Sequence, residues 1–97
     1  MKDELEFEWD FGKAEVNLRK HGIGFDVARR VFEDAFAIEQ PDLDLHYGEA
    51  RFVIMGLVEG RLLRVVYTER SNRIRIISAR KATVHERREY YRSQTHE

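Results

Sequence analysis

Hydrophobic and polar residues alternate in the second half of the chain with the period of two that is typical of β-strands. Three such runs cover Arg51 to Val58, Leu62 to Glu69 and Arg73 to Ala79. A short connection, Glu59-Gly60-Arg61, separates the first two runs, and the turn-forming pair Ser71-Asn72 separates the last two. The pattern therefore predicts an antiparallel β meander.

The first half of the chain shows helical spacing instead. Asp10 is a suitable N-cap for a helix that runs through His21 and ends at Gly22. Apolar residues at helical spacing between Phe25 and Glu33 predict a second, shorter helix. Two further segments are candidates for short strands, at residues 7–9 and 36–39.

The end of the chain predicts one more helix. Thr83 and Glu86 have the spacing of a capping box, and the helix that they start is expected to fray from Ser93 onwards. The predicted order is two helices, the meander and a C-terminal helix, which is an α+β fold of two layers. A chain of 97 residues suits one domain of this kind, and residues 1–97 are expected to form it.

Composition narrows the class of protein. The absence of cysteine excludes disulfides and thiolate metal sites. No apolar run approaches the length of a membrane span, and the acidic start lacks the apolar core of a signal peptide, so a cytoplasmic protein without membrane contact is expected. Five large aromatic residues are expected to form the core: Trp9, Phe25, Phe32, Phe36 and Phe52.

Charge is distributed unevenly along the chain. Residues 1–50 hold 6 Lys/Arg and 13 Asp/Glu, whereas residues 51–97 hold 11 Lys/Arg and 5 Asp/Glu, which gives −7 and +6. Ten of the eleven cations in the second half are arginine, the side chain best suited to bidentate contact with phosphate or carboxylate. Neutralisation of the basic half by the acidic half explains the same numbers equally well.

The arginines that most strongly indicate anion binding lie on the predicted strands. Arg80 and Lys81 lie where a strand ends beside a helix N-terminus, a suitable place to hold a phosphate. Arg64 interrupts an apolar strand and requires an anionic partner, either a ligand or an internal carboxylate such as Glu49 or Glu69. If these arginines share a sheet face with Arg51 and Arg75, they form a cationic groove for a chain of phosphates.

Three other groups of polar residues are candidates for binding or for metal coordination. Lys13, Asn17, Lys20 and His21 share one face of the first predicted helix, which fits either a binding surface or an ordinary solvated face. The loop with Asp42, Asp44, His46 and Glu49 has no metal-site spacing and is interpreted as a solvated acidic loop. The tyrosines Tyr67, Tyr90 and Tyr91 suit either base stacking or the edge of a core.

Several segments together are similar to one known family. Its motifs are Trp9-Asp10, Lys13, Asn17, Lys20-His21-Gly22, Glu49-Ala50-Arg51 and the run from Ile77 to Thr83. Between about Phe7 and Tyr91 the chain resembles the BrnT family of bacterial type II toxins. The resemblance implies a RelE-like fold, RNA cleavage that arrests translation, and no cofactor or metal. It also implies a BrnA-like ribbon-helix-helix antitoxin, through which alone the pair contacts DNA.

The resemblance implies specific roles for the candidate residues in RNA cleavage and RNA binding. Metal-free RNA cleavage requires a base, cations and an acid. Arg64, Arg80 and Lys81 are expected to stabilise the phosphate, His21 to move protons, and Glu49 to serve as a second candidate base. The remaining candidates are expected to bind RNA: Lys13, Asn17, Lys20, Arg51, Tyr67, Arg75 and Tyr91. The alternative is a module that binds RNA or an antitoxin without catalysis and acts in operon regulation.

Overall fold

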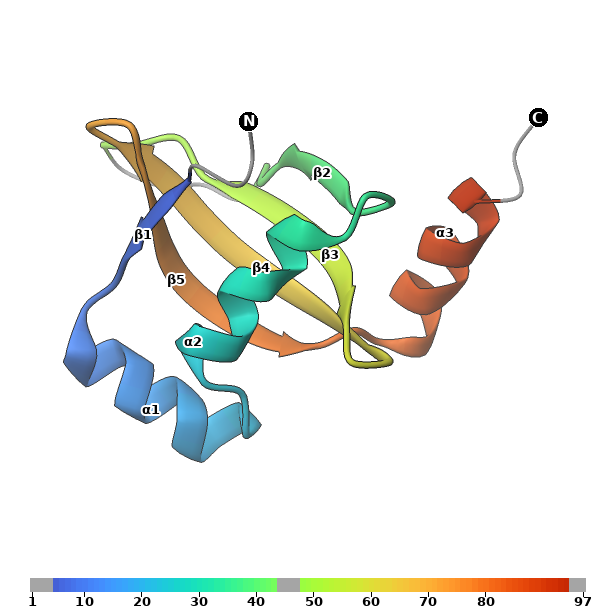
Figure 1. Ribbon diagram of the computed structural model, residues 1–97, viewed down its shortest axis with the longest axis horizontal. Helices are drawn as coiled ribbons and strands as arrows, with labels where there is room; N and C mark the ends of the chain where they lie inside the picture. Colours follow the sequence, from blue (N-terminus) through green and yellow to red (C-terminus); the bar gives the residue numbers. More distant parts are fainter. Residues whose placement is uncertain (1–4, 44–47, 95–97) are drawn as a thin grey trace.

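The computed structural model describes residues 5–43 and 48–94, and its centre is one five-stranded sheet. The strand order is β1-β5-β4-β3-β2 (Figure 1). The strands are β1 (Glu6–Glu8), β2 (Ile38–Pro41), β3 (Phe52–Val58), β4 (Arg61–Arg70) and β5 (Arg73–Lys81). Neighbours β2 to β5 are antiparallel, as the alternation predicts, whereas β1 pairs in parallel with β5 and makes the sheet mixed.

The helices confirm the predicted order of elements. They are α1 (Phe11–His21), α2 (Phe25–Ala28), the 3₁₀ helix η2 (Arg29–Glu33) and α3 (Val84–Gln94). Asp10 caps α1 by accepting the Lys13 N–H at 2.9 Å, and Gly22 ends it with a φ of 72°. The second helix expected from the sequence is thus divided into a short α-helix and a 3₁₀ helix. The α+β prediction is confirmed.

Two tight turns set the register of the meander. Glu59 and Gly60 have φ angles of 51° and 81°, and Ser71 and Asn72 have φ angles of 54° and 66°. Positive φ at both central residues is typical of type I′ hairpin turns, whose twist matches that of the strands. The short flanking strands differ slightly from their predicted bounds, since β1 begins one residue earlier than expected and β2 two residues later.

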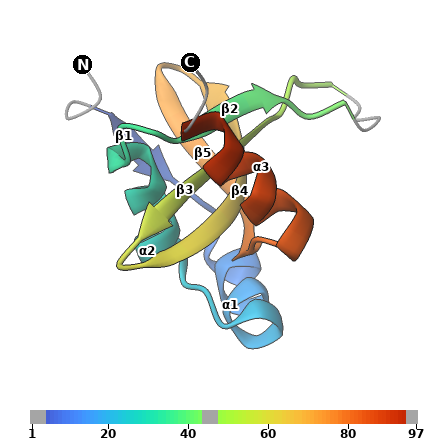
Figure 2. The ribbon, with the colours of Figure 1, turned by 90° about the vertical axis from the view of Figure 1, so that its right-hand side faces the viewer.

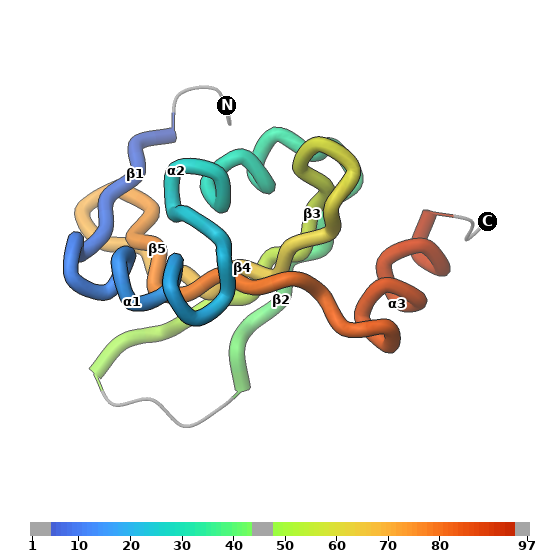
Figure 3. Tube along the Cα trace, turned by 90° about the horizontal axis from the view of Figure 1, so that it is seen from below, coloured from blue at the N-terminus to red at the C-terminus, as the bar shows by residue number. Residues whose placement is uncertain are grey.

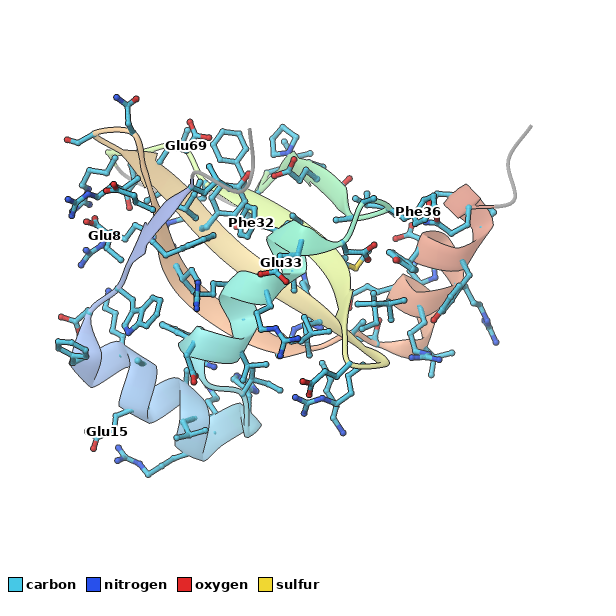
Figure 4. All side chains as sticks on the ribbon, in the orientation of Figure 1. Glu8, Glu15, Phe32, Glu33, Phe36 and Glu69 are labelled. Atoms are coloured by element: carbon cyan, nitrogen blue, oxygen red, sulfur yellow. The ribbon has the colours of Figure 1, made fainter. Side chains whose placement is uncertain are left out.

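The hydrophobic core lies between the sheet and the pair α2–η2. Phe25 and Phe32 are buried there, and Trp9 and Phe52 pack against it while partly exposed. Figure 3 shows α2 on one side of the sheet and α3 beyond its end, and Figure 4 shows Phe32 between η2 and the strands. Phe36 was wrongly predicted to be in the core: its side chain is 66% exposed, because it follows η2 in the loop before β2.

A β-bulge decides which side chains of β5 face the core. Tyr67 pairs with Ile76 and Val66 pairs with Ser78, so Ile77 is an extra residue on β5. Alternation without a bulge would place Arg80 on the same face as Ile74 and Ile76. Because of the extra residue, Ala79 is buried in the core instead. Arg80 therefore lies on the opposite face, which we call the outer face.

Asn17 joins α1 to β5 by its side-chain amide. Its Nδ2 donates to the Ala79 carbonyl at 2.9 Å and to the Ile23 carbonyl at 3.0 Å, and its Oδ1 accepts the Ala79 N–H at 3.1 Å. The amide thus satisfies both backbone groups of Ala79, beyond the point where β1 stops pairing with β5. The buried Asn17 side chain therefore makes the backbone hydrogen bonds that a neighbouring strand would otherwise make with Ala79.

The C-terminal helix α3 packs against β3 and β4, and it lies in front of them in Figure 2. Its start is the predicted capping box, which is confirmed: the Thr83 N–H donates to Glu86 at 2.8 Å and the Glu86 N–H to Thr83 at 3.1 Å. Tyr90 is the buried residue of α3 and packs in a small cluster with Met55 and Leu62. Its hydroxyl donates to Asp34, which follows η2.

Candidate active site

Arg64 and Arg80 lie side by side on the outer face of the sheet. They are direct cross-strand partners on β4 and β5, so the separation of sixteen residues in sequence becomes one inter-strand spacing of about 5 Å. Their side chains are 25% and 34% exposed. Two guanidinium groups that remain partly accessible at this spacing form a site suited to a phosphate.

The partner of both arginines is Glu86, not Glu49 or Glu69. Arg80 donates to the two Glu86 carboxylate oxygens from Nη1 at 2.9 Å and from Nη2 at 3.0 Å. The Nε of Arg64 lies 3.4 Å from Oε2 of the same carboxylate. One negative charge thus faces two positive charges. The sequence identified Glu86 only as a helix-capping residue, and its second role depends on where α3 docks.

The environment of Glu86 stabilises its charged form. Partial burial works to raise its pKa, but the hydrogen bonds from Arg80 and the Thr83 N–H, together with the charges of Arg80 and Arg64, outweigh it and lower the pKa to about 2. Asp34 behaves similarly: burial raises its pKa, and hydrogen bonds from Leu57, Tyr90 and Phe36 lower it below the ordinary value. The start of α3 and its buried Tyr90 therefore each contact an ionised carboxylate.

These shifts predict an acid-sensitive fold. A carboxylate whose pKa is lower in the folded than in the unfolded state stabilises the fold at pH values above the pKa of the unfolded state. This stabilisation is lost as the pH falls toward and through the pKa of the folded state. For Glu86 this loss is expected between its ordinary value of 4.5 and about 2. Urea unfolding at pH 7 and pH 3 should show a smaller loss of stability in Glu86→Gln than in the wild type. An equal loss in both proteins would contradict the assignment.

A hollow beside α1 reaches β5 at Ser78, two residues before Arg80. It has a volume of about 550 Å³ and is lined by Asp10, Gly12, Lys13, Val16, Asn17, Lys20, His21, Ile77 and Ser78. Ser78 lies two residues before Arg80 on β5, and the two share the outer face. The hollow therefore includes a residue of the same sheet face as the arginines, although neither arginine lines it. Lys13, Lys20 and His21 bring two cations and an imidazole to its rim.

Two predicted site residues, Lys81 at the end of β5 and Tyr91 on α3, lie apart from the Arg64–Arg80 pair. Lys81 follows Arg80 but pairs with Leu63 of the core, so its side chain leaves from the other face of the strand. Tyr91 is exposed on α3, where its ring meets Tyr90 edge-on at a centroid distance of 5.1 Å and lies 5.8 Å from the Arg87 guanidinium. Tyr91 remains accessible for stacking.

Three charged candidates lie toward the opposite end of the sheet. Glu49 binds Arg70 at 3.0 Å and lies 3.9 Å from Arg51. It precedes Ala50, whose carbonyl binds Thr68, and Thr68 is four residues, roughly 13 Å, along β4 from Arg64. Arg75 donates to Glu8 of β1 at 3.2 Å (Figure 4 labels Glu8). The structure therefore does not bring Glu49, Arg51 and Arg75 together with the Arg64–Arg80 pair.

Two further candidates are buried and satisfied within the fold. Asn17 is 7% exposed, and its amide makes the three hydrogen bonds described above. Tyr67 is in the core, where its ring stacks on Phe52 and its hydroxyl donates to Glu39 at 2.7 Å. Burial and this carboxylate raise the pKa of Tyr67 well above its usual range. Both side chains have their polar groups engaged internally, which favours structural roles.

Ion pairs within the fold bring together charges from the acidic and the basic half of the chain. Glutamates of the first half pair with arginines of the second half in Arg73–Glu6, Arg75–Glu8 and Arg70–Glu49. In the pair Arg30–Glu59 the arginine belongs to the first half and the glutamate to the second. The acidic half thus partly neutralises the basic half within the fold. Arg64 and Arg80 differ, because their shared partner comes from their own half of the chain.

Within residues 5–43 and 48–94, no three His, Asp or Glu side chains are placed so that they could hold a metal ion. Asp44 and His46 lie outside the described residues. None of the helices in the described part of the chain has the length and apolar character needed to cross a membrane.

The fold and the site define a small α+β protein whose sheet presents an arginine pair suited to phosphate, beside a hollow that contains a histidine. The family described as "Ribonuclease toxin, BrnT, of type II toxin-antitoxin system" matches residues 9–86. The chain belongs to this family, as the sequence resemblance indicated. Comparison with curated proteins gives no significant match to an individual protein. The matched region contains Arg64, Arg80, Glu86 and all of α1.

Proposed function

We propose that the protein is the toxin of a type II toxin-antitoxin pair, an endoribonuclease that cleaves RNA without a metal and thereby inhibits translation. Residues 1–97 act as one BrnT-like domain in the cytoplasm. The observation that carries the proposal is the partly exposed cross-strand pair Arg64–Arg80, on the sheet face that also presents Ser78 to the hollow with His21. Membership of a ribonuclease toxin family supports RNA as the anion that this site binds.

The proposed reaction uses the 2′-hydroxyl of RNA as the nucleophile. Its oxygen attacks the adjacent phosphorus while a base removes its proton, and the bond from phosphorus to the 5′-oxygen breaks as that oxygen receives a proton. The products are a 2′,3′-cyclic phosphate and a 5′-hydroxyl. Arg64 and Arg80 stabilise the negative charge that develops on the phosphorus oxygens, which is the largest contribution such a site makes.

His21 is the proposed proton-transfer residue. It is exposed at the C-terminal end of α1, and histidine is the side chain that most often serves as a general acid or base. Lys13 and Lys20 flank it on the rim of the same hollow and are proposed to hold neighbouring phosphates. Lys81 and Glu49 contribute less in this scheme, because one leaves the sheet from the other face and the other binds Arg70.

The proposed partner is a BrnA-like ribbon-helix-helix antitoxin. Membership of a type II family supports a protein antitoxin encoded with the toxin. We propose that it covers the outer face with Arg64 and Arg80, and that contact with operator DNA is made by the antitoxin alone.

Cleavage of RNA in the presence of EDTA tests the proposed function. Toxin purified free of antitoxin should cut single-stranded RNA and leave 2′,3′-cyclic phosphate ends. His21→Gln should reduce the rate by about 10²-fold or more, the usual loss when a general acid or base is removed. His85→Gln is the matched control, since His85 is an exposed histidine on α3 that contacts Glu89, and it should cleave like the wild type.

Two results would count against the enzyme. If the wild type binds RNA but leaves it intact, the protein is a binding module that acts in operon regulation. If His21→Gln and His85→Gln both cleave at the wild-type rate, His21 moves no proton in the reaction.

A further inference from the structure

The Glu86 carboxylate occupies the position in which the arginine pair would hold a phosphate. Arg80 binds both of its oxygens in a bidentate fork, the geometry in which guanidinium groups bind phosphate as well as carboxylate. Arg64 approaches the same carboxylate through Nε at 3.4 Å. The carboxylate is therefore an internal anion at the centre of the site.

The position of Glu86 is fixed by more than its ion pairs. As the third residue after Thr83, it accepts the Thr83 N–H at 2.8 Å and cannot leave the arginines without giving up this capping bond. The second half of α3 is held by the buried Tyr90 and its hydrogen bond to Asp34. Helix capping and the Tyr90 attachment together hold one carboxylate against both arginines.

From these contacts we infer that Glu86 is an internal competitor for the RNA phosphate, which tunes how tightly the Arg64–Arg80 pair binds RNA. A phosphate that enters the site takes over hydrogen bonds that Glu86 accepts in the free protein. Binding at these two arginines is then an exchange of one anion for another. The residue acts through Arg64 and Arg80 and is thus a positioning residue. This inference rests on the proposed RNA-binding function.

Substitution by glutamine separates the charge from the helix cap. Glutamine also serves at this position of a capping box, so Glu86→Gln keeps α3 while it removes the negative charge from the arginines. Glu89→Gln is the matched control: it removes the same charge one turn along α3, where the carboxylate contacts His85 and neither arginine. Far-ultraviolet circular dichroism and thermal melting establish that both variants are folded.

The test measures binding of a single-stranded 2′-O-methyl RNA, which cannot be cleaved because it lacks a free 2′-hydroxyl. Fluorescence anisotropy of the labelled oligonucleotide should show that Glu86→Gln binds about fivefold more tightly than Glu89→Gln, as expected for removal of one nearby charge. Its affinity should also fall more steeply with salt, by about 0.7 in the slope of log K against log salt, if one more phosphate is engaged.

The opposite results overturn the inference in distinguishable ways. Equal affinities of Glu86→Gln and Glu89→Gln, or weaker binding by Glu86→Gln, show that Glu86 does not compete with phosphate and leave the proposed function standing. Absence of binding in the wild type and in both variants rejects the proposed RNA site and the inference with it. Binding by Glu86→Gln alone supports the inference in its strongest form, with the site masked in the wild type.

Discussion

Replacing Arg80 with alanine is expected to lower the rate of RNA cleavage by about 10²–10³-fold, the usual effect of removing one donor that stabilises a developing oxyanion. Arg80 donates two hydrogen bonds to the shared anion, whereas the Nε of Arg64 lies 3.4 Å from it. The loss should therefore be larger for Arg80→Ala than for Arg64→Ala. Single-turnover cleavage of a labelled RNA measures both effects, and growth of cells that produce each variant reports the same order as toxicity.

Arg61→Ala is the control for this prediction. Arg61 is an exposed arginine at the start of β4, beside the hairpin, so its removal changes the net charge equally without affecting the Arg64–Arg80 pair. Arg80→Ala should still unfold cooperatively, because the site lies outside the core that α2 and η2 cover. If Arg80→Ala cleaves RNA as fast as Arg61→Ala, the pair is structural. If Arg80→Ala melts without cooperativity, the lost activity reports a lost fold.

Replacing Asn17 with alanine is expected to destabilise the fold by about 2–4 kcal/mol. The substitution removes three hydrogen bonds and leaves the N–H and carbonyl of the buried Ala79 without partners on that side. Each unsatisfied buried backbone group costs about 1–3 kcal/mol. For a domain of this size the corresponding fall in melting temperature is roughly 10–30 °C. Urea unfolding and thermal melting measure the two quantities.

Lys13→Ala provides the comparison for Asn17→Ala. Lys13 is exposed one turn earlier on α1, and alanine favours a helix as well as lysine does, so the stability should change by less than about 0.5 kcal/mol. The contrast distinguishes a structural amide from a residue of the binding surface. If Asn17→Ala is as stable as Lys13→Ala but binds RNA weakly, Asn17 contributes to RNA binding and not to the stability of the fold.

Local sequence signals predicted most of the fold because each depends on nearby residues. Asp10, Gly22 and the Thr83–Glu86 box mark helix ends through hydrogen bonds to their own backbone neighbourhood. The alternation of the three long strands follows from one buried face of the sheet. The errors fall on short segments, such as the exposed Phe36, where too few residues establish a period.

The candidate site was less predictable, since its parts come from distant segments. Arg64 and Arg80 stood out in the sequence as charges that require partners, yet the partner carboxylate proved to be Glu86. Lys13, Asn17, Lys20 and His21 were correctly placed on α1, but the central residue of that stripe, Asn17, is turned inward to Ala79. Asp34, which binds Tyr90, had no signal in its local pattern.

The sequence by itself determined the order of elements, their caps and turns, and membership of the BrnT family, because these are carried by local hydrogen bonding and by recognisable motifs. Only the tertiary structure decided which side chains meet on the outer face. Strict alternation along β5 would have directed Arg80 to the core face with Ile74 and Ile76. The extra residue at Ile77 reverses this face and places Arg80 beside Arg64. A bulge forms where paired strands differ in length by a residue, so it depends on β4 and β5 together.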